Sequence, residues 1–230
     1  MTLLRTVALL MPAAGAGRRL GLDVPKALAD IGGLPMVCRA LEPFGRIENL
    51  VEIVVLVPDA ARDTFAAALS KWPGGTLPPR VVVGGVTRQQ SVKLGLSALR
   101  TSPDVVCVHD AARPLATTAL VTAVVAAAAS HGAATAAARP VDSVRQEIGE
   151  GSTRALDRSS LWLVQTPQAF SATLLRDAHW KAETQNLRAT DDASLVERVC
   201  DARIEVVSND DPNLKVTTAS DLAFVRSLFR

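Results

Sequence analysis

Short apolar runs alternate with segments of helical periodicity along the first 138 residues, and this alternation restricts the fold more than any other feature. The predicted strands cover residues 6–10, 50–57, 80–83, 105–108 and 133–138. The predicted helices between them cover residues 35–44, 60–69, 87–99 and 117–129. Such alternation implies a mostly parallel, twisted sheet flanked by helices on both faces, joined by right-handed crossovers. We therefore predict an α/β protein whose binding loops lie at the carboxyl ends of the strands.

The alternation ends near Pro140. Residues 140–148 alternate polar and apolar side chains, a polar turn follows, and residues 156–164 are extended again, which predicts a protruding two-stranded β-arm at about 140–164. Because an isolated hairpin is marginally stable in water, we expect the arm to pack on the body or on a second subunit. Further helices are predicted at 171–183, 192–199 and 218–229, with a strand at 203–207. No repeat or linker divides the sequence, so we predict one domain over residues 1–230.

A glycine-rich basic loop follows the first predicted strand and brings together Gly15, Gly17, Arg18, Arg19 and Lys26. Glycines let backbone N–H groups approach an anion, and the cations supply the countercharge that a triphosphate needs. The glycines alone are more typical of a simple turn than of a phosphate-binding loop. The basic side chains favour a phosphate-binding loop.

Two common nucleotide-binding patterns fit this loop poorly. A dinucleotide site would need a third glycine where the chain has Leu20, and an acidic residue about 20 positions further on. A Walker-type ATPase would need a Gly-Lys-Ser/Thr ending, which the loop lacks. The loop therefore favours a nucleoside triphosphate over NAD.

Charge and hydropathy restrict the partners. The net charge is only +2 and aromatic residues make up 3% of the chain, so we expect no nucleic-acid partner. The apolar run 7–14 is too short to span a bilayer, and the run 123–138 is mostly alanine, so we expect a cytoplasmic protein without a membrane partner. The cysteines, which we expect to be buried free thiols, lack metal-ligand spacing: Cys38, Cys107 and Cys200.

Other candidate residues follow the strands at 80–83 and 105–108. Gly85 precedes a predicted helix that carries Arg88 and Ser91, and the positive end of that helix would face the same edge of the sheet as the basic loop. Asp110 and Arg113 follow the next strand, level with that loop. A glycine turn with a surface arginine, and an ion pair between Asp110 and Arg113, are the simpler interpretations.

The second half of the sequence adds polar residues with open interpretations. Lys215 stands between apolar neighbours, which suggests a lysine held against the sheet edge, although a solvated loop lysine is the alternative. Asp191 and Asp192 fit a helix cap with acid in the first turn. The predicted arm carries Ser143 and Arg158.

Six segments, in this order and spacing, resemble those of one enzyme family. They are PAAGAGRRLGLDVPK, VHDAARP, PVDSV, LWLVQTPQAF, TDDASLVE and NLKVTTASDL. Together they are similar to the 2-C-methyl-D-erythritol 4-phosphate cytidylyltransferases, the CTP-using enzymes of the non-mevalonate isoprenoid pathway. The resemblance covers essentially the whole chain. Ser143 and Arg145 stand where the family commonly has Thr and Lys, so the hydroxyl and the charge are kept.

The resemblance implies a Rossmann-like nucleotidyltransferase fold, a homodimer whose β-arms cross into the partner's active site, and a Mg²⁺ ion bound mainly through the CTP phosphates, with no residue assigned as a metal ligand. The implied catalytic residues are Arg19, Lys26, Arg158 and Lys215. The implied nucleotide-binding residues are Pro12, Ala13, Ala14, Gly15, Ala16, Gly17, Lys26, Gly85, Ser91, Asp110 and Ala111. The implied residues for the polyol phosphate substrate are Asp110, Arg113, Ser143, Arg158 and Lys215.

The implied reaction suits a cationic site. A phosphate oxygen of the acceptor attacks the α-phosphorus of CTP, which brings two anions together, so positioning and countercharge dominate and no side-chain nucleophile is needed. Two alternatives remain: a ribitol 5-phosphate cytidylyltransferase, and a non-catalytic nucleotide-binding module of the same fold. Because the chain ends soon after its last predicted helix, we expect no fused cyclodiphosphate synthase domain.

Overall fold

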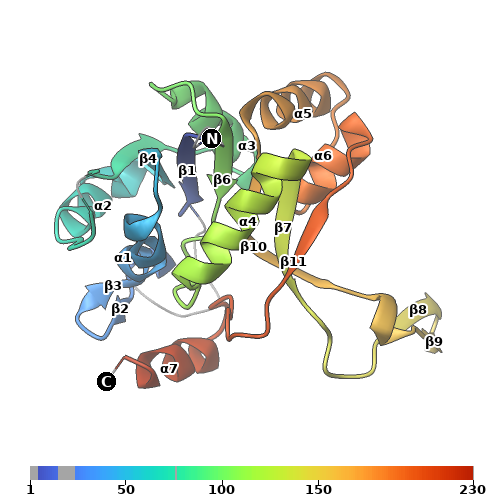
Figure 1. Ribbon diagram of the computed structural model, residues 1–230. Helices are drawn as coiled ribbons and strands as arrows, with labels where there is room; N and C mark the ends of the chain where they lie inside the picture. Colours follow the sequence, from blue (N-terminus) through green and yellow to red (C-terminus); the bar gives the residue numbers. More distant parts are fainter. Residues whose placement is uncertain (1–4, 15–23, 76, 230) are drawn as a thin grey trace.

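The computed structural model describes residues 5–14, 24–75 and 77–229, which build a central seven-stranded sheet with helices on both faces (Figure 1). The strand order is β11-β7-β10-β6-β1-β4-β5. The strands are β1 Val7–Pro12, β4 Leu50–Val57, β5 Arg80–Val83, β6 Val105–Val108, β7 Ala133–Ala138, β10 Leu163–Ser171 and β11 Glu205–Ser208. All neighbours pair in parallel except β10, which runs antiparallel to β6 and β7. The predicted α/β fold with a mostly parallel sheet is confirmed.

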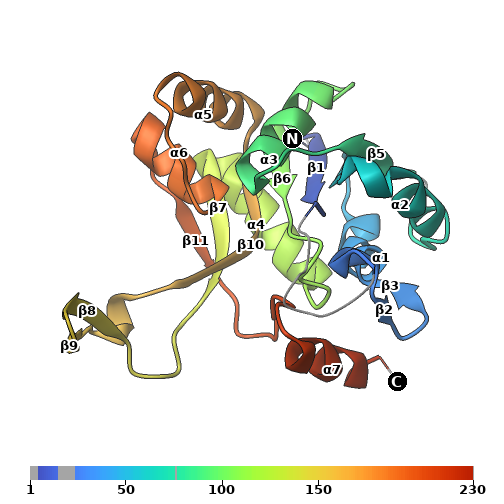
Figure 2. The ribbon, with the colours of Figure 1, turned by 180° about the vertical axis from the view of Figure 1, so that it is seen from behind.

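Two apolar layers hold the helices to the sheet (Figures 1 and 2). Leu9 and Leu10 are neighbours in β1 and belong to opposite layers, because successive side chains of a strand point to opposite faces. The first layer contains buried residues of α1 (Met36–Leu41), α2 (Arg62–Leu69) and α4 (Thr118–His131). The second contains residues of α3 (Arg88–Ala98), α5 (Ala172–Thr184) and α6 (Asp192–Cys200). Both faces of β1 are therefore buried, which explains its uninterrupted apolar sequence.

Side-chain caps set the starts of most long helices. The hydroxyl or carboxylate of the cap accepts a hydrogen bond from a backbone N–H of the first turn, which would otherwise lack a partner. The capping residues are Thr87 for α3, Thr117 for α4, Ser171 for α5, Asp191 for α6 and Thr218 for α7 (Ala219–Ser227). Helix α7 packs through Leu222 and Val225 on a small cluster that includes Ile31 of the hairpin β2 (Asp30–Ile31) and β3 (Leu34–Pro35). The sequence did not predict this short hairpin.

The predicted boundaries of the β-arm are wrong at the second strand. The hairpin is formed by β8 (Arg145–Gly149) and β9 (Ser152–Ala155), and it extends away from the sheet in Figure 1. Leu163 and Val164 belong instead to β10, which pairs with β7 in the central sheet. Strand β10 contains Pro167 and several polar residues, so its sequence lacks the apolar run typical of a buried strand. Its strand conformation depends on pairing with two neighbours that are distant in sequence.

Two smaller differences have local causes. Helix α1 ends at Leu41 and continues as a 3₁₀ helix over Glu42–Arg46, because Pro43 cannot donate the backbone hydrogen bond of a continuing α-helix. Cys38 and Cys107 are buried free thiols as predicted, whereas Cys200 is partly exposed.

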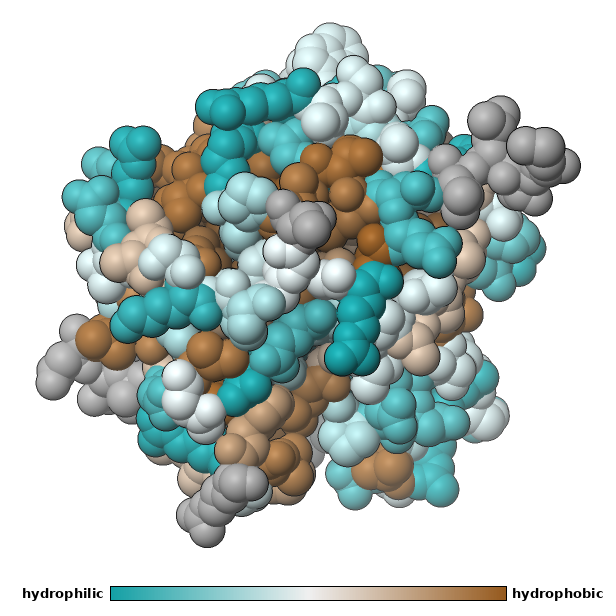
Figure 3. All heavy atoms as spheres, turned by 60° about the vertical axis from the view of Figure 1, so that its left-hand side comes forward, coloured by the Kyte–Doolittle hydropathy of each residue, from teal (hydrophilic) through white to brown (hydrophobic). Residues whose placement is uncertain are grey.

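Strand β1 lies at the point where the chain changes direction across the sheet. From β1 the chain continues to β4 and β5 on one side, and it then crosses to β6 on the other. In open α/β sheets, ligands bind at the carboxyl ends of the strands beside such a switch point. On the face shown in Figure 3, hydrophilic side chains surround several separate hydrophobic areas. No helix in the described part of the chain is both long and apolar enough to cross a membrane.

Candidate active site

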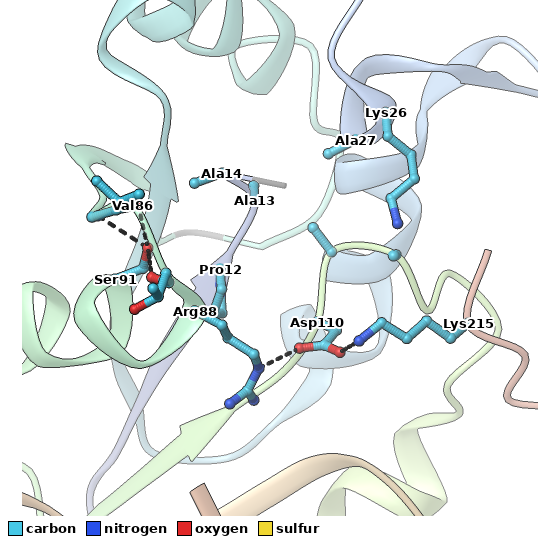
Figure 4. A pocket seen from close by; sticks show the side chains of 14 residues that line it. Pro12, Ala13, Ala14, Lys26, Ala27, Val86, Arg88, Ser91, Asp110 and Lys215 are labelled. Carbon is cyan, nitrogen blue, oxygen red and sulfur yellow. Dashed lines mark hydrogen bonds and ion pairs between the residues drawn. The ribbon is translucent and has the colours of Figure 1, made fainter. Parts of the chain in front are cut away.

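A cavity of about 250 Å³ lies at the carboxyl ends of β1, β5 and β6 (Figure 4). Segments from distant parts of the sequence form its walls. Its lining residues are Pro12, Ala13, Ala14, Lys26, Ala27, Gly85, Val86, Thr87, Arg88, Ser91, Asp110, Ala111, Ala112 and Lys215. The structure therefore brings together all of the described residues that the sequence assigned to nucleotide binding, and it adds Lys215.

The end of β1 forms one wall with small side chains. Ala13 is held to the neighbouring strand because its backbone N–H donates a hydrogen bond of 2.7 Å to the carbonyl oxygen of Leu56. The backbone N–H of Ala111 lies 3.4 Å from the carbonyl oxygen of Pro12 on the other side. Residues 15–23 of the predicted phosphate loop lie outside the described residues, and they include Gly15, Ala16, Gly17, Arg18, Arg19 and Leu20.

A tight turn after β5 forms the opposite wall. The backbone N–H of Gly85 donates to Oγ of Ser91 at 3.1 Å, and that hydroxyl donates to the carbonyl oxygen of Thr87 at 2.9 Å. A Cβ atom on Gly85 would lie 2.4 Å from Cβ of Gln90, so only glycine fits this approach of the turn to α3. The N-terminus of α3 lies at the cavity, where its free N–H groups and positive dipole end favour an anion.

Two lysines reach the cavity from segments far apart in the sequence. Nζ of Lys26, at the start of a 3₁₀ helix (Lys26–Leu28), donates a hydrogen bond of 2.8 Å to the carbonyl oxygen of Val216. Nζ of Lys215 forms an ion pair of 2.6 Å with Oδ2 of Asp110. Figure 4 shows both ammonium groups pointing toward the space beside Asp110. Lys215 is 43% exposed, so it keeps access to a ligand.

Asp110 is held between two cations. Its Oδ1 atom lies 3.0 Å from Nε of Arg88, and its Oδ2 atom is bound by Lys215. Burial alone would raise the pKa of Asp110, but the charges of Arg88 and Lys215 lower it below its usual range. The carboxylate is therefore ionised at neutral pH.

The simpler interpretation of an Asp110–Arg113 ion pair is wrong. Nη1 of Arg113 donates to the carbonyl oxygen of Asn213 at 2.6 Å, while Asp110 pairs with Arg88 and Lys215. Arg113 lines a second hollow of about 540 Å³, which also borders Lys215. Two of the predicted substrate-binding residues therefore meet in a hollow beside the cavity.

Two buried residues that the sequence did not assign hold the loop carrying Asp110. The backbone N–H of Asp110 donates to Oγ1 of Thr166 at 3.0 Å, and that hydroxyl lies 3.2 Å from Nδ1 of His109. Nε2 of His109 lies 3.1 Å from the carbonyl oxygen of Arg113. Burial lowers the pKa of His109 to about 4, so the ring is neutral. Because a carbonyl can only accept, we infer that Nε2 carries the proton and that Nδ1 accepts from Thr166.

His109 follows the predicted strand at 105–108 and stands in the quoted VHDAARP segment. Its position at a strand end was the sequence signal that could have marked it as part of the site. Thr166 stands in the quoted LWLVQTPQAF segment, but residues 165–171 of β10 were not predicted as a strand, so its place beside His109 could not be foreseen.

Ser143 and Arg158 lie in the arm and are exposed. Arg158 donates through Nη1 to the carbonyl oxygen of Val141, within the same arm. Neither residue lines the cavity that the described residues of one chain form. The arm leaves the body between β7 and β10, and the hairpin β8–β9 extends away from the sheet.

Arg88 was a candidate residue in the sequence, but no catalytic or binding role was predicted for it. It bridges Asp110 and Asp192, with Nη1 lying 2.6 Å from Oδ2 of Asp192. Asp191 caps α6 as predicted, because its Oδ1 atom accepts from the backbone N–H of Ser194 at 2.8 Å. The ion pair between Asp192 and Arg88 could not be predicted from the position of Asp192 in the first turn of a helix.

The described cavity carries one carboxylate, that of Asp110. In the part of the chain that the structure describes, His, Cys, Asp and Glu side chains do not gather in threes at any point where they could hold a metal ion. Magnesium in nucleotide sites is commonly held by substrate phosphates with one or two carboxylates and water. The donor set at this cavity therefore fits an ion that arrives with a nucleotide.

Comparisons with known proteins agree on one family. The sequence model of 2-C-methyl-D-erythritol 4-phosphate cytidylyltransferase matches residues 7–230. The cytidylyltransferase of that name from Deinococcus radiodurans is 40% identical over 227 residues, covering 97% of this chain and 89% of the relative. The one from Geobacillus kaustophilus is 38% identical over 216 residues, covering 94% and 93%. The crystal structure of the Thermus thermophilus enzyme matches with a TM-score of 0.80 and 33% identity, covering 98% of this chain and 99% of that chain.

Proposed function

Because this chain belongs to the family of 2-C-methyl-D-erythritol 4-phosphate cytidylyltransferases, we propose that the cavity between β1, β5 and β6 is where it transfers CMP from CTP to the phosphate of 2-C-methyl-D-erythritol 4-phosphate. The chain is a nucleotidyltransferase of isoprenoid precursor biosynthesis. The observation that carries the assignment of the cavity is the convergence of Lys26, Lys215 and the N-terminus of α3 on one space.

The reaction needs countercharge and alignment more than a nucleophilic side chain. A phosphate oxygen of the acceptor forms a bond to the α-phosphorus of CTP, and the bond from that phosphorus to the bridging oxygen breaks, releasing pyrophosphate with the electron pair. Negative charge grows on the bridging and leaving oxygens in this step. Fixed cations and N–H groups stabilise such charge without reorganisation.

The small wall residues and the glycine turn suit the nucleotide. We propose that Pro12, Ala13 and Ala14 leave room for the base and ribose, while backbone groups near Gly85 contact the nucleotide. Ser91 is 1% exposed, and its hydroxyl is used within the turn, so its contribution is to shape the wall. The N-terminus of α3 supports an anion at this wall.

Lys26 and Lys215 would bind the phosphates of CTP and of the acceptor, respectively. We propose that Lys26, with Arg19 from the loop outside the described residues, stabilises charge on the α-phosphate and the pyrophosphate. Lys215 borders both the cavity and the second hollow, so it is placed to hold the acceptor phosphate where the two spaces meet. Arg113 would complete the acceptor side from the wall of that hollow.

A Mg²⁺ ion is proposed as the cofactor. When bound, such an ion would neutralise phosphate charge and orient the leaving group. Among the described residues that line the cavity, Asp110 has the one carboxylate that could contribute a ligand, although both its oxygens are engaged by Arg88 and Lys215. We therefore propose that the ion is held mainly through the CTP phosphates.

The arm supports a proposal about assembly. Ser143 and Arg158 lie away from the cavity of their own chain, so we propose a homodimer in which each arm reaches the partner's cavity and supplies these two residues. Apolar side chains in or beside the arm are exposed in the single chain, among them Val141 at 82% and Ile148 at 59%. A partner subunit packed on the arm would bury these side chains, and burial of apolar surface favours association. We also propose a cytoplasmic location, as for other enzymes that draw on a CTP pool.

Pyrophosphate release separates the candidate functions. The purified protein is incubated with CTP and Mg²⁺ and with either 2-C-methyl-D-erythritol 4-phosphate or ribitol 5-phosphate, with a control that lacks an acceptor. Release that depends on the methylerythritol phosphate supports the proposal. Preference for the ribitol substrate would favour the sister activity, and CTP binding without release from either acceptor would indicate a non-catalytic module.

A further inference from the structure

The ion pairs at Asp110 continue into the body of the protein, away from the cavity. Arg88 contacts Asp110 through Nε at 3.0 Å and Asp192 through Nη1 at 2.6 Å. Its third nitrogen, Nη2, is buried and has no hydrogen-bond partner among the residues that the structure describes. The orientation of the guanidinium group therefore depends on the two carboxylates.

Asp192 is the inner end of this arrangement. Its side chain is 1% exposed, and its Oδ1 atom lies 3.1 Å from Nε2 of His179 on α5. The backbone N–H of Asp192 donates to Oε1 of Gln168 in β10 at 3.1 Å. Burial alone would raise the pKa of Asp192, but the charge of Arg88 and the hydrogen bond from His179 lower it, so the residue is a carboxylate. Asp192 and His179 lie behind Arg88, outside the set of residues that line the cavity.

This geometry couples Asp192 to the position of Lys215. Arg88 holds one oxygen of Asp110, and the other oxygen binds Nζ of Lys215. If Asp192 lost its charge, Arg88 would keep only one carboxylate partner and would be free to turn toward Asp110. A shift of Asp110 would move the ammonium of Lys215, and displacements near 1 Å in reacting groups cost about 10²-fold in rate.

We propose that Asp192, supported by His179, is a positioning residue for cytidylyl transfer. It holds Arg88 in the orientation that fixes Asp110, and Asp110 in turn fixes Lys215 at the cavity. Asp192 touches neither substrate. This inference rests on the proposed function of the cavity.

The first test is the substitution Asp192→Asn, which removes the charge and keeps the shape. We expect kcat for pyrophosphate release to fall by about 10- to 100-fold, since misplaced groups chiefly affect the transition state. KM for CTP should change by less than about threefold, because the walls made by β1 and the Gly85 turn remain. Asp192→Glu, which keeps the charge, should recover part of kcat. Glu183→Gln on the same side of α5 breaks only a surface ion pair with Lys93, and it should leave kcat unchanged.

A double-mutant cycle with Asp110→Asn distinguishes positioning from a merely structural role. If Asp192 acts through Asp110, adding Asp192→Asn to Asp110→Asn should lower kcat by less than about twofold further. Losses that multiply independently, or a wild-type kcat in folded Asp192→Asn, would overturn the inference. Should Asp192→Asn fail to fold, His179→Asn enters the same cycle, with an expected loss of about 3- to 10-fold alone and the same non-additivity. Wild-type protein that releases no pyrophosphate would contradict the proposed function itself, whereas active wild type with additive losses contradicts only this inference.

Discussion

Nζ of Lys26 donates a hydrogen bond of 2.8 Å to the carbonyl oxygen of Val216, which lies 190 residues further along the chain. The backbone N–H of Val216 donates in turn to the carbonyl oxygen of Ala112 at 2.8 Å. The segment that carries Lys215 is thereby tied both to Lys26 and to the loop after β6. The backbone of Val216 thus contributes to the relative placement of the two lysines.

Replacement of Lys26 tests the proposed stabilisation of phosphate charge. For Lys26→Ala we expect kcat to fall on the order of 10²-fold or more, because a preorganised cation near the α-phosphate is lost. Pyrophosphate release at saturating CTP and acceptor measures this effect, and circular dichroism checks the fold. Lys71→Ala, at an exposed lysine outside the cavity lining, serves as the control. Near-normal turnover of folded Lys26→Ala would contradict the proposed role.

Replacement of Lys215 tests the acceptor side. For Lys215→Ala we expect kcat/KM for 2-C-methyl-D-erythritol 4-phosphate to fall on the order of 10²-fold, since Lys215 borders the hollow proposed for that substrate. The affinity for CTP, measured by calorimetry without acceptor, should change much less. A loss of CTP binding with unchanged acceptor kinetics would assign Lys215 to the nucleotide instead.

Mixed dimers test whether the arm serves the partner's cavity. Chains with Lys26→Ala and chains with Arg158→Ala are purified separately and as a mixed dimer, which is isolated through two different affinity tags. With exchanged arms, one of the two sites in the mixed dimer combines an intact body with an intact arm, so we expect about half of the wild-type activity. Each homodimer should remain nearly inactive.

An inactive mixed dimer would show that each arm serves its own chain. Sedimentation that detects only monomer at micromolar concentration would contradict the proposed dimer itself.

The buried ring of His109 predicts a pH dependence of stability. Burial in the folded protein lowers the pKa of His109 to about 4, from the ordinary histidine value of 6.5. Between these pH values the unfolded chain binds a proton that the folded chain does not, so stability is fully present above pH 6.5 and decreases as the pH falls toward 4. The expected decrease is on the order of 2–3 kcal/mol. Urea unfolding from pH 7 to 4.5 measures it, and His109→Asn should show a smaller slope. An equal slope in both proteins would contradict the assignment to His109.

Local sequence patterns were sufficient for the main architecture. The strand at residues 50–57 and the helix following Thr117 were predicted within a residue or two, because burial on both faces and side-chain capping leave signals over a few consecutive residues. The glycine turn at Gly85 was also visible, since only glycine fits where a strand meets a helix so closely. The order of these elements indicated in advance which strand ends would share an edge.

The tertiary structure decided those features that depend on contacts between segments distant in sequence. Strand β10 carries no strand pattern of its own and exists because β6 and β7 pair with it on either side. Arg88 and Asp192 are ordinary first-turn residues of their helices in sequence, yet they form a partly buried ion pair across 104 positions. Hydrogen bonds and ion pairs between segments depend on where whole elements pack, which short-range periodicity does not encode. The sequence thus determined the fold class and the edge at which the site lies, while packing determined which charges meet there.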